Sequence, residues 1–325
     1  MSDKIYVLIF IFSFFILAIS CKTGVLNPDL LKWNDSEELI FHTGFNNTTI
    51  FPISSSMDGI AGIDTTFNTA NDWDKLEEHE NIGRVRINYE DGTKSQRYAQ
   101  ITSDPTNSSN DVLMFKIIEP HIKEGLKKKG RVNMFIYKNN NLREVYQTVR
   151  IYLHPDMEYL KQWDEKFSWL TLFEFWNRDN KYKNQFRVNV NIVKKDYGIT
   201  DELYFRVHGD KNKIFGGWKI IWDEISTDFS IPFGEWIDLE LYIKEGDENS
   251  GRFYMAVIYE NKSKQVLFNI NNMTQHPKDK ILNGFTGLNS MKLYTSDKLI
   301  DFMKNNSKNL EVYWDDWELY KYKTP

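Results

Sequence analysis

Alternation of apolar and polar side chains from Gly83 onward is the feature that most constrains the fold of this chain. Residues 83–89, 145–154 and 186–193 place apolar and polar groups on opposite faces of an extended strand. Turn signals such as Asp91-Gly92 separate such segments. The one helix candidate lies between residues 155 and 163. The pattern predicts an all-β fold of two antiparallel sheets packed as a sandwich, and it excludes α/β folds.

The sequence shows no sign of a boundary between domains. No internal repeat, proline-rich linker or long charge run interrupts residues 36–325. We therefore expect them to form a single β-sandwich domain, since such domains often exceed 200 residues. Cys21 is the only cysteine, so no internal disulfide can form and the domain must be stabilised by its own core.

The first residues predict export. An apolar run from Ile5 to Ile19 follows Lys4 and is shorter than the roughly 17–25 residues that a membrane-spanning helix needs. It suits a signal peptide over residues 1–20. Residues 17–21, Leu-Ala-Ile-Ser-Cys, resemble the bacterial lipobox, which implies cleavage before Cys21 and lipid attachment to its thiol.

We accordingly expect residues 21–35 to be a lipidated tether and the protein to lie outside the cytoplasm, anchored to a bacterial membrane. The alternative is an ordinary signal peptide or anchor with an incidental cysteine. The formal net charge of −5 argues against a nucleic-acid partner that is attracted by the overall field. We expect a monomer.

Three motifs in the second half of the chain resemble a known group of sandwiches. They are residues 233–242, which include Gly234-Glu235-Trp236, residues 251–255, and residues 310–320. They are similar to strands of the concanavalin A-like lectin and glucanase group, a jelly-roll fold that includes polysaccharide lyases, hydrolases and carbohydrate-binding modules. The resemblance implies a concave groove and a polysaccharide partner. It specifies fold more than activity, because one fold hosts many functions.

Polar and aromatic residues on the outward faces of several strands predict the site. Tyr and Trp are well suited to sugars, because their rings stack on sugar faces while their polar tips reach water. The residues expected to bind substrate are Tyr146, Tyr152, Glu174, Trp176, Arg187, Asn189, Asn191, Tyr204 and Lys292. Lys292 and Tyr294 lie where lyases of this fold carry a Lys-x-Gly-x-Tyr strand, although Leu293 is followed directly by Tyr294 and the glycine is missing.

These residue types match the requirements of β-elimination from a uronic acid. The reaction needs a cation or amide on the sugar carboxylate, a base for the C5 proton and an acid for the leaving oxygen. We expect Arg150 and Arg206 on the carboxylate, His208 as base and Tyr294 as acid. The competing interpretation is that these groups form a wet polar face whose arginines pair with Asp or Glu.

Hydrolysis is less well supported. It needs two carboxylates at a defined separation, and the strand alternation puts Glu235 on the opposite face from Asp238 and Glu240. Glu174, beside Trp176, is the better candidate for a lone acid or for an acceptor of sugar hydroxyls.

Metal signals are few. No His or Cys cluster has zinc spacing. Asp315 aligns with the place where many of these sandwiches bind a structural calcium, so the resemblance implies a possible Ca²⁺ site there. The sequence thus predicts an exported lipoprotein that binds, and by preference cleaves by β-elimination, an acidic extracellular polysaccharide. Two alternatives are a non-catalytic carbohydrate-binding or surface-assembly protein and a purely structural or adhesive lipoprotein.

Overall fold

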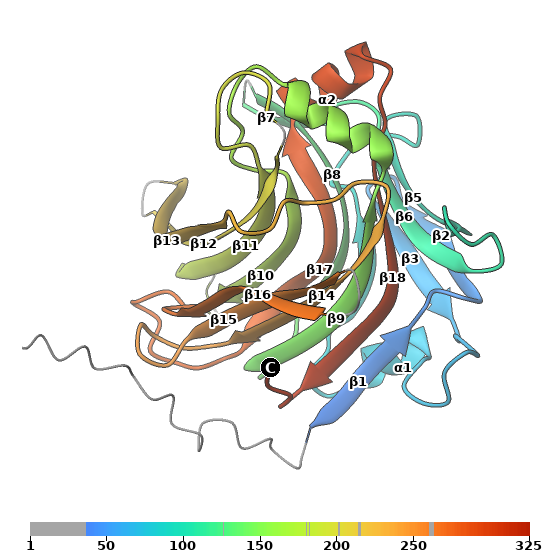
Figure 1. Ribbon diagram of the computed structural model, residues 1–325. Coiled ribbons are helices and arrows are strands. Elements are labelled where there is room, and N and C mark those ends of the chain that lie inside the picture. The colour runs from blue at the N-terminus through green and yellow to red at the C-terminus, as the bar shows by residue number, and fades with distance from the viewer. Residues whose placement is uncertain are drawn as a thin grey trace, which may run out of the picture. The chain divides into compact units, whose positions relative to one another are not determined.

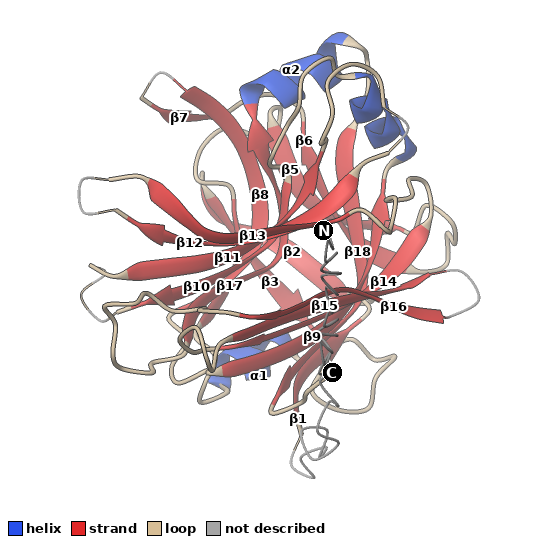
Figure 2. Cartoon of the chain, turned by 60° about the vertical axis from the view of Figure 1, so that its left-hand side comes forward, coloured by secondary structure: helices blue, strands red, loops and turns tan. Residues whose placement is uncertain are grey.

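A computed structural model describes residues 37–325 except 126, 180, 182, 201, 214–215 and 260–262. Two antiparallel sheets face each other, and the strands of the larger sheet are visibly curved (Figures 1 and 2). The predicted all-β sandwich is therefore confirmed. The predicted signal peptide, Cys21 and the tether lie outside the described residues.

The larger sheet has ten strands. Their order is β13 (Trp218–Ser226), β12 (Tyr204–Asn212), β11 (Gln185–Val193), β10 (Thr171–Arg178), β17 (Phe285–Ser296), β8 (Lys127–Tyr137), β4 (Arg84–Asn88), β3 (Met57–Gly62) and β2 (Thr48–Ser54), and β7 (Ile122–Glu124) pairs with β8. The segment 119–129 contributes β7 and the start of β8. Its lysine-rich composition does not show the pairing of Ile122 with Lys129.

The smaller sheet has eight strands. Their order is β16 (Ser263–Asn271), β15 (Arg252–Tyr259), β14 (Trp236–Lys244), β9 (Glu144–Leu153), β18 (Leu310–Lys321), β6 (Asp111–Ile117) and β5 (Arg97–Ser103), and β1 (Glu38–Thr43) pairs with β18. The motifs that carried the family resemblance lie in β14, β15 and β18, so all three belong to this sheet.

Helices are few and short. They are α1 (Trp73–Glu78), a 3-10 helix at Pro155–Gln162 and α2 (Asp297–Asn305). The sequence pattern predicted only the second of these. α2 begins after Ser296, whose hydroxyl accepts a hydrogen bond from the Leu299 backbone N–H, as in a usual helix cap. None of the helices in the described part of the chain is long and apolar enough to span a membrane.

Strand alternation explains why the sheets pack as they do. On β8, Val132, Met134 and Ile136 are fully buried between the sheets. Arg131 and Phe135, one residue out of phase, face the other side of the strand and line a cavity. The ten-stranded sheet thus buries one face in the core and turns its other, concave face outward.

Candidate functional site

A groove on the concave face of the ten-stranded sheet brings together most of the predicted site residues. The cavity measures about 580 Å³, and its walls come from β8, β17, β10, β11, β12 and β13. Nine predicted residues line it: His208, Tyr294, Arg206, Glu174, Trp176, Arg187, Asn189, Asn191 and Lys292. They belong to four adjacent strands, which explains how residues more than 100 positions apart in the chain reach one cavity.

The lining of the groove has an excess of positive charge. Six basic side chains face three acidic ones: Lys129, Arg131, Arg178, Arg187, Arg206 and Lys292 against Glu90, Glu174 and Asp210. The net charge of the whole chain, −5, has the opposite sign. A local basic cleft of this kind attracts anionic ligands in spite of the overall charge.

His208 lies on β12 between two amides. Asn189 Nδ2 is 3.3 Å from its Nε2, and Asn191 Nδ2 is 3.4 Å from its Nδ1. A neutral imidazole has one acceptor nitrogen, so at most one amide can donate to it at a time. Asp210 Oδ2 lies 3.7 Å from Nε2. Asn189, Asn191 and Asp210 therefore hold the ring in a polar setting on the groove face of the sheet.

Two groove arginines already have acidic partners. Arg206 donates from Nε and Nη2 to both oxygens of Asp223, each at 2.7 Å. Arg187 makes the same two-pronged contact with Asp210, at 2.8 and 3.0 Å. Such paired hydrogen bonds fix the guanidinium plane and use much of its donor capacity. The interpretation that the arginines pair with carboxylates therefore holds for these two residues.

Tyr294 on β17 lies at the most basic end of the groove. The guanidinium of Arg131 and the ammonium of Lys292 are each 4.8 Å from its ring centre. Trp169 packs against the ring at 4.9 Å. Cations within about 6 Å of an aromatic face attract it, so the phenol is held in place and surrounded by positive charge.

The floor of the groove contains a buried ion pair. Glu174 on β10 and Lys292 on β17 are 3% and 1% exposed, and their charged atoms are 2.5 Å apart. Burial tends to raise the pKa of Glu174, but the charges of Lys292 and Arg187 outweigh it and lower that pKa. A carboxylate that stays ionised cannot act as a general acid. This corrects the expectation that Glu174 serves as a lone acid.

Aromatic rings form the other end of the groove. Trp176 on β10 and Trp218 on β13 meet edge to face with ring centres 5.3 Å apart. Arg178 lies 4.0 Å above Trp176, and Arg187 lies 4.0 Å above Trp218. Both indoles are partly exposed. This corner offers ring faces held at fixed angles, the arrangement that stacking on a sugar requires.

Four predicted site residues lie elsewhere. Arg150, Tyr146 and Tyr152 are on β9 in the eight-stranded sheet, on the opposite side of the sandwich. Arg150 pairs there with Asp238 and Asp316, at 3.2 and 3.3 Å. Tyr204 begins β12 but does not line the groove, and its hydroxyl donates to Glu202. Placing Arg150 on the substrate carboxylate was therefore wrong, because strand alternation does not specify the sheet to which β9 belongs.

The groove also includes residues that the sequence analysis passed over. Trp169, Trp218, Arg131, Asp210 and Asn289 all line it. Alternation along residues 131–137 could have identified Arg131, since it lies out of phase with the apolar residues. Trp218 gave no such signal, because β13 is an edge strand with an irregular pattern and four exposed isoleucine or acidic positions after Lys219.

The surroundings of Asp315 do not fit a calcium ion. Asn110 donates to its Oδ2 at 2.9 Å, and Arg150 Nη1 lies 3.6 Å from the same oxygen. Calcium takes six to eight oxygen ligands, whereas an amide and a guanidinium occupy this carboxylate. No group of three or more His, Cys, Asp or Glu residues that could hold a metal occurs in the described part of the chain. Calcium binding stays a prediction.

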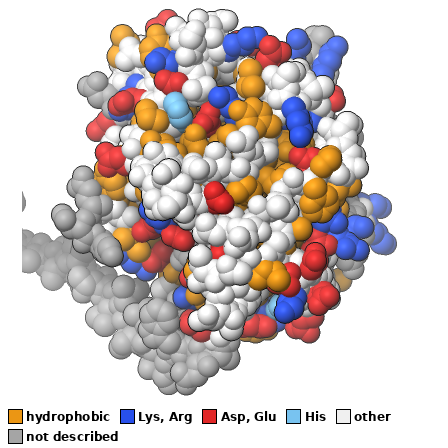
Figure 3. Space-filling view, turned by 90° about the vertical axis from the view of Figure 1, so that its right-hand side faces the viewer, with side chains coloured by type: hydrophobic (Ala, Val, Ile, Leu, Met, Phe, Trp, Pro, Cys, Tyr) orange, Lys and Arg blue, Asp and Glu red, His pale blue; other side chains and the backbone are white. Residues whose placement is uncertain are grey.

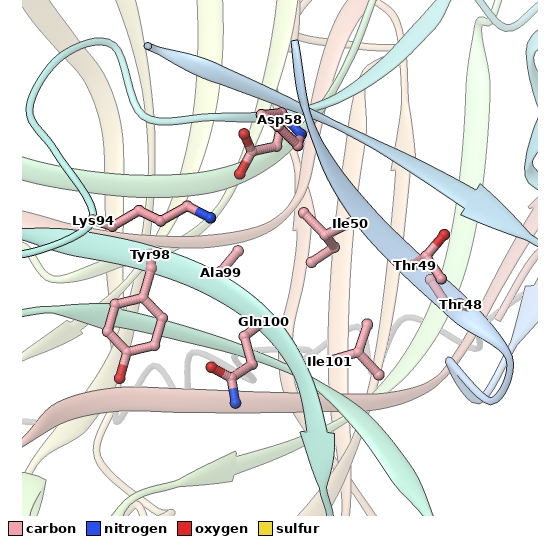
Figure 4. A pocket seen from close by; sticks show the side chains of 10 residues that line it. Thr48, Thr49, Ile50, Asp58, Lys94, Tyr98, Ala99, Gln100 and Ile101 are labelled. Atoms are coloured by element: carbon pink, nitrogen blue, oxygen red, sulfur yellow. The ribbon is translucent and has the colours of Figure 1, made fainter. Parts of the chain in front are cut away.

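A second cavity of about 580 Å³ lies between the edge strands β2 and β5 (Figure 4). Lys94 and Asp58 lie toward one side of it, and Thr48 and Ile101 toward the other. The Tyr89 hydroxyl donates to Asp58 at 2.6 Å. Its described lining contains no His, Glu or Arg. Hydrophobic side chains gather near the middle of the molecular face shown in Figure 3, with charged ones mainly toward its edges. The second cavity thus has a single basic and a single acidic side chain in its described lining, Lys94 and Asp58, and lacks the excess of positive charge found in the groove.

Comparison with known proteins gives likenesses of structure only. No family model matches the chain, and no curated protein matches it. A mutant of alginate lyase Aly36B in complex with an alginate tetrasaccharide is 12% identical, covering 88% of this chain and 98% of that one, with a TM-score of 0.47. The marine PL-14 alginate lyase from Aplysia kurodai is 9% identical (87% and 99%, TM-score 0.46). An endo-β-1,4-glucuronan lyase from the fungus Trichoderma reesei is 11% identical (72% and 90%, TM-score 0.44).

Proposed function

We propose that the chain binds an acidic polysaccharide in this groove and cleaves it by β-elimination. The observation that carries the proposal is the groove lining itself: a cavity with three more basic than acidic side chains, which also contains His208, Tyr294 and exposed indoles. A polyanion supplies the missing negative charge, and the indoles supply surfaces for its sugar rings.

The proposed reaction uses His208 as base and Tyr294 as acid. His208 takes the proton from C5 of a uronic acid, and the electrons of that bond form a double bond between C4 and C5. The bond from C4 to the glycosidic oxygen breaks, and that oxygen takes a proton from the Tyr294 hydroxyl. The amides of Asn189 and Asn191, which flank His208, interact with the sugar carboxylate in place of Arg150. Amide and cation donors of this kind stabilise the charge that develops as C5 loses its proton.

The assignment requires the two residues to reach one sugar from strands that are not neighbours. The strands that carry His208 and Tyr294, β12 and β17, are separated by β11 and β10. Three interstrand spacings correspond to about 14 Å between their backbones. Both side chains project from a concave face and extend toward the cavity between them. A sugar residue bound across β10 and β11 would have the base on one side and the acid on the other.

An ultraviolet assay tests the proposal, because β-elimination creates an unsaturated uronate that absorbs where the substrate does not. The wild-type protein should raise the absorbance of at least one member of a panel of acidic glycans, and His208→Ala should abolish the rise. Wild-type protein that gives no product from any acidic glycan would remove the lyase proposal.

A specific observation favours a second function, non-catalytic binding of the same polysaccharide. Arg187 and Arg206 are held by Asp210 and Asp223, so they act as fixed parts of the surface and have little capacity left for a reacting carboxylate. In that case the protein should be retarded in gels that contain the polysaccharide, Trp176→Ala should weaken the retardation, and no unsaturated product should form.

We also propose that the domain is held at a membrane by lipid on Cys21. The support is the apolar run and the residues that precede the cysteine. Metabolic labelling with an alkyne-tagged fatty acid should mark the wild-type protein in a bacterial host and leave Cys21→Ser unlabelled. Labelling of both proteins, or of neither, would contradict the anchor.

A further inference from the structure

Glu174 lies at the centre of a polar network that crosses the floor of the groove. Its Oε2 accepts hydrogen bonds from Lys292 Nζ at 2.5 Å and Asn289 Nδ2 at 2.9 Å, and its Oε1 accepts one from Arg187 Nη1 at 3.2 Å. Asn289 Oδ1 in turn accepts from Asn133 Nδ2 at 2.6 Å. The network links β8, β17, β10 and β11 through side chains alone.

The carboxylate has little capacity left for a ligand. Both of its oxygens are occupied by donors from the protein, and the side chain is 4% exposed. Burying a carboxylate without partners would cost several kcal/mol, and cationic partners offset that cost. The three donors therefore stabilise Glu174, and Glu174 in turn supplies the counter-charge of buried Lys292, while it shares Arg187 with Asp210.

We propose that Glu174 is a positioning residue: its carboxylate fixes the Lys292 ammonium on the groove floor and, together with Asp210, the Arg187 guanidinium beside it. The functional consequence of this inference rests on the proposed function: the groove floor presents ordered cations to an incoming polyanion. The inference does not rest on that function for its test, because the charge state of Lys292 can be measured without turnover.

The charged groups around Lys292 determine the expected result. Glu174 faces it from β10, Arg187 from β11, Arg131 from β8 and Tyr294 from its own strand. Burial lowers the pKa of Lys292, Glu174 raises it, and Arg131 and Arg187 lower it further. Glu174 is thus the one group among these causes that favours the protonated amine by attraction. Removing its charge leaves every remaining influence acting in the opposite direction.

The experiment is a lysine titration by NMR on protein labelled with ¹³C at the lysine ε-carbons. Lys292→Met identifies the Lys292 signal. In Glu174→Gln, the pH midpoint of that signal should fall by about one unit or more, the effect expected of an opposite charge at this distance. Glu174→Asp keeps the charge and should restore most of the shift. Lys298, whose side chain is 67% exposed, provides an internal control that should not move.

An unchanged Lys292 midpoint in folded Glu174→Gln would overturn the proposal. Circular dichroism establishes whether that variant is folded, and if it is not, wild type is compared with Glu174→Asp, where a Lys292 midpoint about one unit lower in spite of the retained carboxylate would also overturn the proposal. If the midpoint shifts as expected while no acidic glycan is bound or cleaved, the positioning role stands and the proposed function fails. The two conclusions are therefore tested separately.

Discussion

The outward faces of the two sheets carry similar residue types but differ in how those residues are packed. On the eight-stranded sheet, Tyr254, Tyr242, Tyr146 and Tyr320 are cross-strand neighbours on four adjacent strands. Three of them are buried against one another. The Tyr242 hydroxyl donates to Glu144 at 3.3 Å and the Tyr320 hydroxyl to Glu318 at 3.0 Å. The rings of these tyrosines therefore pack against one another, and two of their hydroxyls are hydrogen-bonded to neighbouring glutamates.

The groove differs because its aromatic rings border a cavity, whereas the tyrosines of the outer face pack under cations as well as carboxylates: Lys323 lies 3.8 Å from the ring centre of Tyr320. Trp176 and Trp218 contact Arg178 and Arg187, and Tyr294 contacts Arg131. The rings remain partly exposed and border a cavity. The comparison teaches that a row of aromatic and basic residues indicates a ligand site only where the sheet is concave and the positive charge exceeds the negative.

The largest expected effect is on kcat/KM, which should fall for a substitution in the groove and not for one on the outward face of the eight-stranded sheet. His208→Ala in the groove should lower kcat/KM at least about 100-fold, since general base catalysis contributes roughly 10²–10⁴-fold. Arg150→Ala on the opposite sheet is the matched control, and it should leave kcat/KM within about twofold per folded molecule. Initial rates on the best acidic glycan measure both. Equal losses in the two variants would mean that the groove is not the site of the reaction.

The sequence allowed the strands that form the groove to be recognised, but it did not show which strands belong to the same sheet. Arg187, Asn189 and Asn191 share one face of β11 by alternation alone, and the structure places all three in the groove. Arg150 and Tyr152 alternate just as regularly on β9, yet they face away from the groove because β9 pairs with β14 and β18. Pairing between distant strands depends on long-range contacts, and alternation within a single strand does not encode it.

The sequence also did not show which acidic residue pairs with which basic residue in the groove. Arg206 and Asp223 are 17 residues apart and on neighbouring strands, and Glu174 and Lys292 are 118 residues apart. Only the register of β12 with β13 and of β10 with β17 brings these partners together. Residue types alone therefore indicated cations in the groove but could not reveal which of them were already paired.

The next-largest effect is on the free energy of unfolding, and it comes from Asp315 on the eight-stranded sheet. Burial, together with the neighbouring charge of Asp316, raises the pKa of Asp315 to about 7, compared with about 3.9 in an unfolded chain. The folded state therefore binds a proton more tightly than the unfolded state, and stability falls as the pH rises from about 4 to 7. Asp315→Asn should raise the free energy of unfolding at pH 8 by up to about 4 kcal/mol.

Urea denaturation at pH 8 and pH 4 measures this difference. The gain from Asp315→Asn should be largest at pH 8 and should shrink to nothing below about pH 4, where wild-type Asp315 is protonated in both states. A destabilised variant at pH 8 would show that the ionised carboxylate, through Arg150 and Asn110, contributes more than its burial costs.

A smaller effect is expected for binding. Trp176→Ala should weaken polysaccharide binding about three- to tenfold, since aromatic pairs contribute roughly 0.5–1.5 kcal/mol beyond the area they bury. Tyr320→Ala removes a ring of the outer face and should leave binding unchanged. Affinity electrophoresis with the polysaccharide in the gel measures both variants. Stronger loss in Tyr320→Ala would move the binding surface to the eight-stranded sheet.

The smallest expected effect is that of calcium on the wild-type protein. Arg150 places its guanidinium among Asp238, Asp315 and Asp316, so the carboxylate at which the sequence predicted calcium already has a cationic partner. A chelator should leave the melting temperature within about 1 °C, because a ligand shifts stability only where it binds. A chelator that lowers the melting temperature of the wild-type protein would restore the calcium site predicted from the sequence, and it would show that Arg150 and the ion bind these carboxylates together.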